Sequence, residues 1–304
     1  MDTIPAEFAQ RSIDIDGEPA RDWVAQLPAL LESLADLWSL SLGSPFPPLS
    51  YSYLCPVSRQ DNTEAVLKLR FPGPGMAREV ECLTAFAGDG AVLLLESDVD
   101  RGALLLERIR PGSDLSALTD DEAVQQFATV VRRLHKPPPT VSPFPAVADW
   151  GQGFERHRTI GEGSSPLPSR LIDAAQAVHG ELAGSMDQPV LLHGDLHHGN
   201  ILAGTRQPWL AIDPQGVVGE RAYEVGAFLR NPIDTLSARP DLESLMSRRV
   251  SLVSEVMQLD RGRVIGWGMA QAVLAGIWSY EDHGTGWEEW VRIGEALDVL
   301  RRSA

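Results

Sequence analysis

Cysteine, lysine and long apolar runs are all scarce in this chain of 304 residues. Its two cysteines, Cys55 and Cys82, are too few for a disulfide scaffold and are typical of a reducing compartment. No stretch reaches the ~20 uninterrupted apolar residues that cross a bilayer. The first residues, MDTIPAEFAQR, contain no apolar core of a signal peptide. We therefore expect a cytoplasmic protein with no membrane partner.

Basic residues are outnumbered: 26 Lys and Arg stand against 42 Asp and Glu, a formal net charge of −16. Such a surface repels a phosphate backbone, so we expect no nucleic-acid partner. It would attract a cationic small molecule, although solubility alone explains an acidic surface equally simply. Lysine occurs only at Lys68 and Lys136, while arginine fills the other 24 basic positions. Each lysine therefore calls for a chemical reason.

The hydrophobic pattern divides the chain into two parts. In the first part, residues 21–40 have the apolar spacing of a helix, with Pro28 near its start. A further helix is expected at 77–86, with Val80 and Leu83 on its apolar face and Glu79 elsewhere. Short apolar segments predict strands at 50–56, 65–71, 91–96 and 103–109.

After residue 110 the pattern becomes mostly helical. Thr119 and Glu122 have the spacing of a capping box, which opens a helix that the prolines at 137–139 end. Residues 137–168 are typical of a long loop with one short helix. We predict an α+β fold with a small N-lobe (1–109), an antiparallel sheet with a helix, and a larger, mainly helical C-lobe (110–304).

The sharpest signal is the segment 190–216, VLLHGDLHHGNILAGTRQPWLAIDPQG. His193, Asp195, Asn200 and Asp213 match the spacing of the protein-kinase catalytic loop, H-x-D-L-x-x-x-N, with a metal-binding Asp after it. Phosphoryl transfer needs an aligned nucleophile, so Asp195 would orient the acceptor hydroxyl and take its proton late. Asn200 and Asp213 offer the hard oxygen ligands that Mg²⁺ prefers. His193 would brace the loop by hydrogen bonding.

This segment has two other interpretations. His193, Asp195, His197 and His198 could form a transition-metal cluster, or the segment could be an incidental loop with buried polar residues. The kinase spacing also explains Asn200 and the later Asp213, which a zinc site would not. We therefore prefer the kinase interpretation.

A kinase also needs a cation on its N-lobe sheet. The segment 65–69, AVLKL, is similar to the kinase strand whose lysine meets the α- and β-phosphates, which makes Lys68 the candidate. Glu79, eleven residues later, is positioned to pair with it, and Glu81 is the alternative. The apolar strand that ends at the lobe boundary would offer backbone groups to adenine, near Glu107 and Ile109.

Four segments carry a resemblance to a known family: HGDLHHGNIL, AIDPQGVVGERAYEVGAFLRNP, GALLLERIRPG and IWSYEDHG. In order and spacing they resemble the aminoglycoside phosphotransferase family, specifically its streptomycin 6-kinase and hydroxyurea-kinase-like branch. The resemblance covers roughly residues 20–300. It implies a kinase-like fold, Mg²⁺ with ATP as donor, and O-phosphorylation of a small molecule.

By this match, Asp195 takes the catalytic position, Asn200 and Asp213 the metal positions, and Lys68 with Glu79 the ion pair. The choice of Glu79 over Glu81 rests on Leu83 and Phe86, which then fall at the family's apolar offsets. The loop SYSYLCPVSRQ departs from the pattern because it lacks the glycines of a phosphate-covering loop. The family's short serine-containing loops leave Ser50 and Ser52 as weak nucleotide candidates.

The C-terminal segment 278–298 supplies the acceptor candidates. It holds six acidic residues against one basic residue, interleaved with Trp278, Tyr280, Trp287 and Trp290. Carboxylates beside aromatic faces suit guanidinium or ammonium ligands, and a solvated acidic helix face with core tryptophans is the equal alternative. The resemblance favours three pocket residues: Trp278, Glu281 and Asp282.

The sequence thus predicts an ATP-dependent O-phosphotransferase acting on a small, hydroxylated, cationic molecule of the streptomycin type. A metabolic kinase acting on an amino alcohol or sugar needs the same phosphate machinery, so it stays the alternative. A nucleotide-binding pseudokinase is disfavoured because Lys68, Asp195, Asn200 and Asp213 are all intact. The oligomeric state cannot be read from the sequence.

Overall fold

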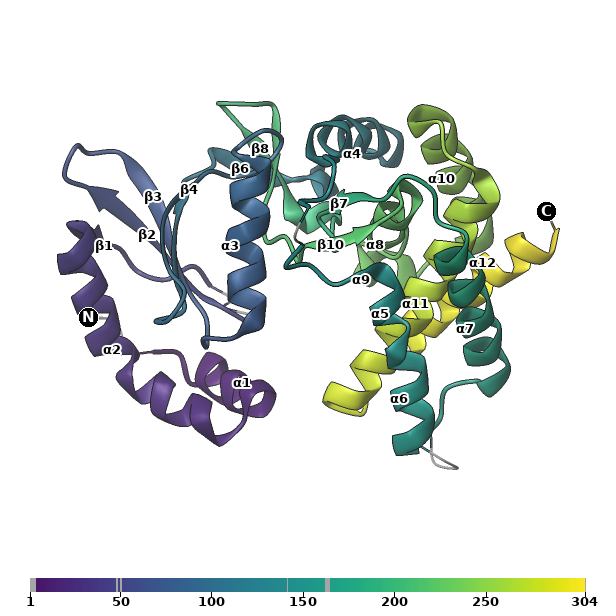
Figure 1. The fold of residues 1–304 in the computed structure, drawn as a ribbon, viewed down its shortest axis with the longest axis horizontal. Coiled ribbons are helices and arrows are strands. Elements are labelled where there is room, and N and C mark those ends of the chain that lie inside the picture. Colours follow the sequence, from purple (N-terminus) through teal and green to yellow (C-terminus); the bar gives the residue numbers. More distant parts are fainter. Residues whose placement is uncertain (1–3, 48, 50, 141, 162–164, 304) are drawn as a thin grey trace. The chain divides into compact units, whose positions relative to one another are not determined.

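The structure is a computed structural model that describes residues 4–47, 49, 51–140, 142–161 and 165–303. Its internal contacts divide the chain into two compact units (Figure 1). The first unit is Met1–Gly88 with Val92–Arg110, and the second is Asp89–Ala91 with Pro111–Ala304. A single cut after residue 109 misses the short segment Asp89–Ala91. This segment joins the second unit because the Ala211 N–H donates to the Gly90 carbonyl at 2.8 Å.

The first unit contains a five-stranded antiparallel sheet in the order β1-β2-β3-β5-β4. Its strands are Leu40–Leu42 (β1), Tyr53–Arg59 (β2), Glu64–Leu69 (β3), Leu94–Asp98 (β4) and Ala103–Glu107 (β5). The four strands that the sequence predicts correspond to β2–β5, with ends shifted by up to three residues. The edge strand β1 was not predicted.

Two helices share a hydrophobic core with this sheet: Ala6–Asp16 (α1) and Glu18–Trp38 (α2). Phe8 of α1 and Trp23, Leu27 and Leu31 of α2 belong to the core. Pro28 lies inside α2 rather than near its start, so that prediction was wrong. A proline there removes one helix hydrogen bond, but the buried stripe continues on both sides of it and holds the helix together.

The helix α3, Pro74–Phe86, corrects a second expectation. Glu79 lies on the same buried face as Leu83 and Phe86, whereas Val80 is only half-buried and Glu81 is exposed. A buried carboxylate requires a partner, and Lys68 of β3 supplies one.

The second unit holds two small antiparallel sheets, β10-β7 and β6-β8-β9. Their strands are Pro111–Asp114 (β6), Val190–Leu192 (β7), Ile201–Gly204 (β8), Trp209–Ala211 (β9) and Val217–Gly219 (β10). Three short 3₁₀ helices accompany them: Leu115–Ala117 (η1), His198–Asn200 (η2) and Arg221–Glu224 (η3).

Helices form the rest of this unit. They are Asp120–Leu134 (α4), Val147–Trp150 (α5), Gln152–Gly161 (α6), Ser169–Gly184 (α7), Val225–Leu229 (α8), Ile233–Ser237 (α9), Leu242–Met257 (α10), Arg261–His283 (α11) and Glu288–Ser303 (α12). The capping box of Thr119 and Glu122 is confirmed at the start of α4. The expected single short helix within 137–168 is two helices, α5 and α6.

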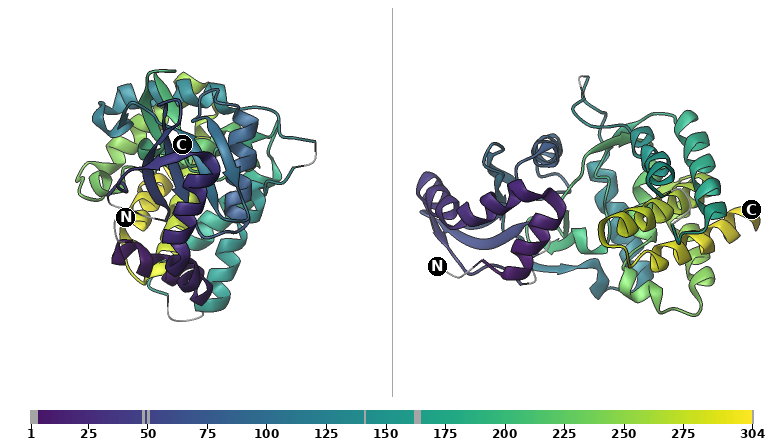
Figure 2. Two further views of the ribbon diagram at one scale, coloured as in Figure 1. Left: turned by 90° about the vertical axis from the view of Figure 1, so that its left-hand side faces the viewer. Right: turned by 90° about the horizontal axis from the view of Figure 1, so that it is seen from below.

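The helix α11 is the core of the second unit. Nearly every side chain from Val264 to Ile277 is buried, because α11 contacts α6, α7, α8, α10 and α12 (Figures 1 and 2). None of the described helices is both long and apolar enough to span a membrane.

Candidate active site

The loop 193–200 is held at both ends by sheet partners. Leu192, the last residue of β7, pairs with Val217 of β10, and Ile201, the first of β8, pairs with Ala211 of β9. The Ile212 N–H donates to the Asn200 carbonyl at 3.0 Å. This bond brings the backbone of Asn200 next to the residue that precedes Asp213. The fold thus gathers the predicted catalytic and metal residues from two strand ends.

His193 bonds to backbone groups through both ring nitrogens. Its Nε2 is 2.8 Å from the Ile212 carbonyl, and its Nδ1 accepts the Asp195 N–H at 3.3 Å. A neutral imidazole protonated on Nε2 satisfies both contacts. His193 therefore links the start of the loop to the residue before Asp213.

Asn200 is oriented by the same loop. Its side-chain Nδ2 donates to the Asp195 carbonyl at 2.9 Å, which leaves the amide oxygen as an acceptor. Asp213 has a φ of 57°, a conformation that costs a non-glycine residue roughly 1–2 kcal/mol. Such strain concentrates at functional sites. An amide oxygen and a carboxylate are ligands that fit Mg²⁺.

The remaining histidines of the loop have separate structural contacts. His197 Nδ1 accepts the Gly199 N–H at 3.1 Å, and burial lowers the pKa of this histidine. His198 stacks on Phe228 with ring centroids 4.3 Å apart, and burial lowers its pKa to about 3. Within the described part of the chain, no group of three His, Cys, Asp or Glu side chains could hold a metal ion. The kinase interpretation of the loop stays a prediction.

Glu224 anchors the start of the loop. No role was assigned to this residue from the sequence. Its fully buried carboxylate accepts the N–H groups of His193 at 2.7 Å and Gly194 at 2.9 Å. Burial alone would raise the pKa of Glu224, but hydrogen bonding and charge at His135, with the bond from the Gly194 N–H, hold this pKa below its usual range. Glu224 is therefore an anion that fixes the backbone immediately before Asp195.

Asp195 itself is in contact with a second residue that the sequence did not single out. Arg230 Nη2 lies 2.9 Å from Asp195 Oδ1. Both Glu224 and Arg230 occur within the segment AIDPQGVVGERAYEVGAFLRNP, so the signal was present as part of a family motif. Their partners are 30 or more residues distant along the chain, which spacing alone could not reveal.

The first unit contains the other predicted charged pair. Lys68 Nζ lies 2.7 and 2.9 Å from the two carboxylate oxygens of Glu79, and both side chains are at least 94% buried. Lys68 faces Leu54 of β2 and Leu104 of β5 in the sheet register. The structure thus pairs Lys68 with Glu79 rather than with the exposed Glu81, and the nucleotide-binding role of the pair stays a prediction.

The Lys68–Glu79 pair can be measured directly by unfolding. Removing either partner leaves a buried charge, so we expect Lys68→Met and Glu79→Leu each to lose about 3–5 kcal/mol of unfolding free energy. The double variant should lose much less than the sum of the two. Glu81→Leu is the matched control and should stay within about 0.5 kcal/mol of wild type. Urea unfolding measures the four variants and the wild type, and additive losses would contradict the pairing.

The remaining nucleotide candidates also lie in the first unit. Ser52 and Ile109 are buried, and Ser50 lies outside the described residues. The backbone N–H of Glu107 donates to the Leu93 carbonyl at 2.9 Å, and its carboxylate accepts the Leu93 N–H at 3.1 Å. The N–H of Glu107 is thus already used within the sheet. Contacts of Ser52, Glu107 and Ile109 with a nucleotide stay predictions.

The predicted acceptor residues are on the last turns of α11. Trp278 is half-buried and Asp282 is exposed. Glu281 is only 17% exposed, and its carboxylate contacts Arg156 Nη2 at 2.6 Å and His157 Nδ1 at 3.7 Å. Glu281 therefore already has a cationic partner on α6, which the sequence did not indicate.

An additional tryptophan joins Trp278. Trp150, at the end of α5, meets Trp278 edge to face with ring centroids 6.2 Å apart and an interplanar angle of 82°. Its indole also lies against the loop, because a Cβ placed on Gly194 would be 3.5 Å from Trp150 Cη2. We call Trp150 and Trp278 the aromatic corner; its Trp150 lies against Gly194, the residue before Asp195.

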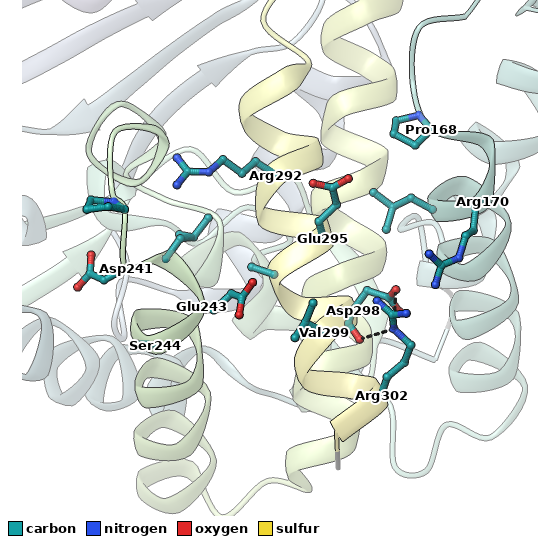
Figure 3. A pocket seen from close by; sticks show the side chains of 14 residues that line it. Pro168, Arg170, Asp241, Glu243, Ser244, Arg292, Glu295, Asp298, Val299 and Arg302 are labelled. Atoms are coloured by element: carbon teal, nitrogen blue, oxygen red, sulfur yellow. Dashed lines mark hydrogen bonds and ion pairs between the residues drawn. The ribbon is translucent and has the colours of Figure 1, made fainter.

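A separate cavity of about 700 Å³ opens between α7, α10 and α12 (Figure 3). Its lining contains none of the predicted site residues. Asp298 pairs with Arg301 and Arg302, and Arg292 donates to the carbonyls of Ser237 and Arg239. These charges are satisfied within the chain. Asp298, one of the six acidic residues of 278–298, therefore holds α12 together.

Comparisons with known proteins agree with this geometry. A family model described as aminoglycoside/hydroxyurea antibiotic resistance kinase matches residues 39–283. The chain belongs to this family. It is 33% identical over 282 residues to streptomycin 6-kinase of Streptomyces glaucescens, covering 92% of this chain and 91% of the relative. It is 32% identical over 294 residues to hydroxyurea phosphotransferase of Kitasatospora aureofaciens, covering 92% of this chain and 81% of the relative.

The fold comparison extends to more distant kinases. The choline kinase LicA of Streptococcus pneumoniae superposes with a TM-score of 0.63 at 14% identity, over 90% of this chain and 98% of that protein. The predicted kinase-like α+β fold is confirmed. As a member of the antibiotic resistance kinase family, the protein is a phosphotransferase with an alcohol group as acceptor.

Proposed function

We propose that this kinase transfers the γ-phosphoryl group of ATP to a hydroxyl group of a cationic small molecule of the streptomycin type. The observation that carries this proposal is the aromatic corner, which lies against Gly194, the residue before Asp195, with the Glu281 carboxylate one turn of α11 beyond Trp278. The relatives named as streptomycin and hydroxyurea kinases support the reaction class. The net charge of −16 supports a cationic acceptor. The cytoplasmic location stays a prediction.

In this proposal each of the predicted catalytic, metal and nucleotide residues has one task. Asp195 accepts a hydrogen bond from the acceptor hydroxyl and takes its proton as the new oxygen–phosphorus bond forms. The bond between the γ-phosphorus and the bridging oxygen breaks, and ADP carries away that electron pair. Asn200 and Asp213 would hold Mg²⁺, which when bound neutralises phosphate charge. Lys68, held by Glu79, would contact the α- and β-phosphates.

The acceptor would use the aromatic corner and the nearby carboxylates. A guanidinium group on the face of Trp150 or Trp278 gains a cation–π interaction, and a carboxylate beside it adds charge-assisted hydrogen bonds. Glu281 and the exposed Asp282 lie on the last turns of α11, just after Trp278. The contact of the Arg156 guanidinium with Glu281 supports a role for this carboxylate toward that chemical group.

A panel of acceptors tests the proposal. ATP turnover is measured with streptomycin, other aminoglycosides, hydroxyurea and choline, and the phosphorylated product is identified by mass spectrometry. We expect a guanidinium-bearing acceptor to give the highest kcat/KM. A neutral alcohol as best acceptor, with a rate independent of ionic strength, would contradict the cationic acceptor and leave the kinase class intact.

An amino-alcohol kinase is the second candidate. The aromatic corner would also accept a quaternary ammonium group by cation–π contact, which is the observation that favours it. The two candidates differ at Glu281, because a guanidinium donates hydrogen bonds to a carboxylate and a quaternary ammonium has none to donate. The panel above separates them through its choline arm.

Glu281 and Arg156 provide a prediction with opposite signs for two substitutions. Losing a charge-assisted hydrogen bond, worth about 1.5–3 kcal/mol, should raise the streptomycin KM of Glu281→Gln by roughly ten- to a hundredfold. Arg156→Ala frees the same carboxylate from a pair whose arginine is half exposed, which makes the pair worth about 0–1 kcal/mol. The streptomycin KM should therefore fall, by up to about fivefold. Steady-state kinetics with saturating ATP measure both.

The ATP parameters of both variants serve as internal controls and should not change. Arg158→Ala, which removes a guanidinium from the same helix at an exposed pair with Asp173, is the matched control for Arg156→Ala. If neither Glu281→Gln nor Arg156→Ala changes the streptomycin KM while both lower thermal stability, Glu281 only ties α11 to α6. The acceptor would then bind elsewhere.

A further inference from the structure

Arg230 follows α8 directly and has its guanidinium against Asp195. Its Nη2 is 2.9 Å from Asp195 Oδ1, and its side chain is 11% exposed, compared with 30% for Asp195. The guanidinium carbon also lies 5.8 Å from the ring centroid of Trp290 on α12. Asp195 is thus contacted by a largely buried cation on the side of Oδ1.

The hydrogen bonds around Arg230 do not explain why a cation is buried at this position. Within the described part of the chain, its Nε and Nη1 are buried without a hydrogen-bond partner. An unsatisfied buried donor costs about 1–3 kcal/mol, and more when it is charged. A residue kept only for stability would be expected to pair these groups. The strong partner that Arg230 does have is the predicted catalytic carboxylate.

The backbone that carries Arg230 is itself fixed. Arg249, which is 4% exposed, donates from Nη1 to the Asn231 carbonyl at 2.7 Å and to the Leu229 carbonyl at 3.4 Å. Its Nε donates to Asp120 at 2.6 Å. Carbonyls on both sides of Arg230 are therefore held by one buried arginine. The backbone of Arg230 is therefore held in place. A residue that orients another side chain requires such a fixed backbone.

The two oxygens of Asp195 are consequently not equivalent. Oδ1 is bonded to Arg230, whereas Oδ2 has His197 Nε2 at 3.8 Å, beyond hydrogen-bond distance. An ion pair on one carboxylate oxygen fixes the rotation of the carboxylate group, and this rotation sets the direction of the second oxygen. A base must lie within hydrogen-bond reach of the proton that it removes, so this rotation decides whether Asp195 can act.

We propose that Arg230 is a positioning residue for phosphoryl transfer: it fixes the Asp195 carboxylate through Oδ1 and so directs Oδ2 to the acceptor hydroxyl. This inference rests on the proposed function, because it assigns Asp195 as the base. Arg230 itself takes no proton and forms no covalent bond.

Removal of the guanidinium should reduce kcat with little change in KM. A misplacement of about 1 Å in an active site can cost about a hundredfold in rate, and we expect a loss of this size for Arg230→Met. The KM for ATP should stay within about twofold because Arg230 contacts the base rather than the nucleotide. Arg230→Lys should recover only part of the rate, since a lysine offers a point charge in place of a planar fork.

A double-mutant cycle with Asp195 separates positioning from other roles. If Arg230 acts through Asp195, Arg230→Met should cause no further loss in an Asp195→Asn background. A further hundredfold loss in that background would overturn the proposal, because Arg230 would then act on the phosphoryl group or the acceptor directly. Unchanged kcat in Arg230→Met with wild-type Asp195 would overturn it as well.

Folding and the proposed function are checked in the same experiment. Circular dichroism and thermal melting are measured for every variant, and Arg239→Met, which breaks an exposed pair with Asp241, is the matched control expected to keep wild-type kcat. Turnover is followed both with streptomycin and as slow ATP hydrolysis by water. If wild type phosphorylates no acceptor, the proposed acceptor fails. The double-mutant cycle is then measured by the rate of ATP hydrolysis, in which Asp195 would orient the attacking water. A further hundredfold loss in the Asp195→Asn background, or an unchanged kcat in Arg230→Met, would again overturn the proposal.

Discussion

Asp195→Asn is expected to lower kcat by about 10²- to 10⁴-fold, the range that a positioned general base contributes. The amide is nearly isosteric, so Oδ1 can still accept from Arg230 Nη2, whose contact in wild type is 2.9 Å. What is lost is the ability to take the proton of the acceptor hydroxyl. The KM for ATP and the melting temperature should stay close to the wild-type values. Steady-state kinetics with a radiolabelled γ-phosphate measure the loss.

The control for this variant is the equivalent change at an exposed carboxylate. Asp187 lies on the surface of the same unit, six residues before the loop begins at 193, and Asp187→Asn should leave kcat unchanged. Near-normal turnover of Asp195→Asn would remove the kinase mechanism for this chain. A large loss accompanied by a lower melting temperature would instead indicate that Asn disturbs the loop, which circular dichroism would reveal.

The parts of the fold that the sequence predicted are those with local causes. The helix α4 begins at a capping box and buries Val124, Phe127, Val131 and Leu134, all of which the periodicity identifies. The strands β3 and β5 are short apolar runs bounded by polar or glycine residues. Their burial on the sheet follows from composition alone, because a run of branched and long apolar side chains has no favourable exposed position.

Misplaced features have long-range causes. The strand β1 is only Leu40–Leu42, and it exists because Leu40–Leu42 finds β2 as a partner. Glu79 was expected away from the apolar face of α3, but it is buried there because Lys68, eleven residues earlier, neutralises it. Hydrophobic periodicity treats every carboxylate as a surface residue, so it misplaces one that has an internal partner.

The active-site residues show the same division. The spacing of His193, Asp195, Asn200 and Asp213 is a property of one continuous segment, so the sequence could predict it. Glu224 and Arg230 reach this loop from 30 to 35 residues away, and Trp150 reaches it from the end of α5. Their contributions depend on the assembled helices of the second unit, which no local pattern encodes.

Asp213→Ala should be the most damaging change at the metal positions. A bound metal ion stabilises the charge of the transferred group by several kcal/mol. At 1.36 kcal/mol per decade, losing its carboxylate ligand should lower kcat/KM for ATP by about 10³-fold or more. Asn200→Ala removes a neutral ligand and should be milder. Titration of nucleotide affinity against Mg²⁺ concentration, by isothermal calorimetry, separates a binding defect from a rate defect.

The backbone at Asp213 gives this prediction a second readout. Because its φ is 57°, a left-handed conformation that alanine disfavours by roughly 1–2 kcal/mol, Asp213→Ala could lose activity through strain instead of through its ligand. Asp213→Gly relieves that strain and still lacks the carboxylate. If Asp213→Gly recovers Mg²⁺-dependent binding, the residue acts through its backbone and the metal lies elsewhere. If Asp213→Gly is as defective as Asp213→Ala while Asp213→Asn retains part of the affinity, the side-chain oxygen is the ligand. The strain would then be the cost of directing that oxygen toward the loop that carries Asn200.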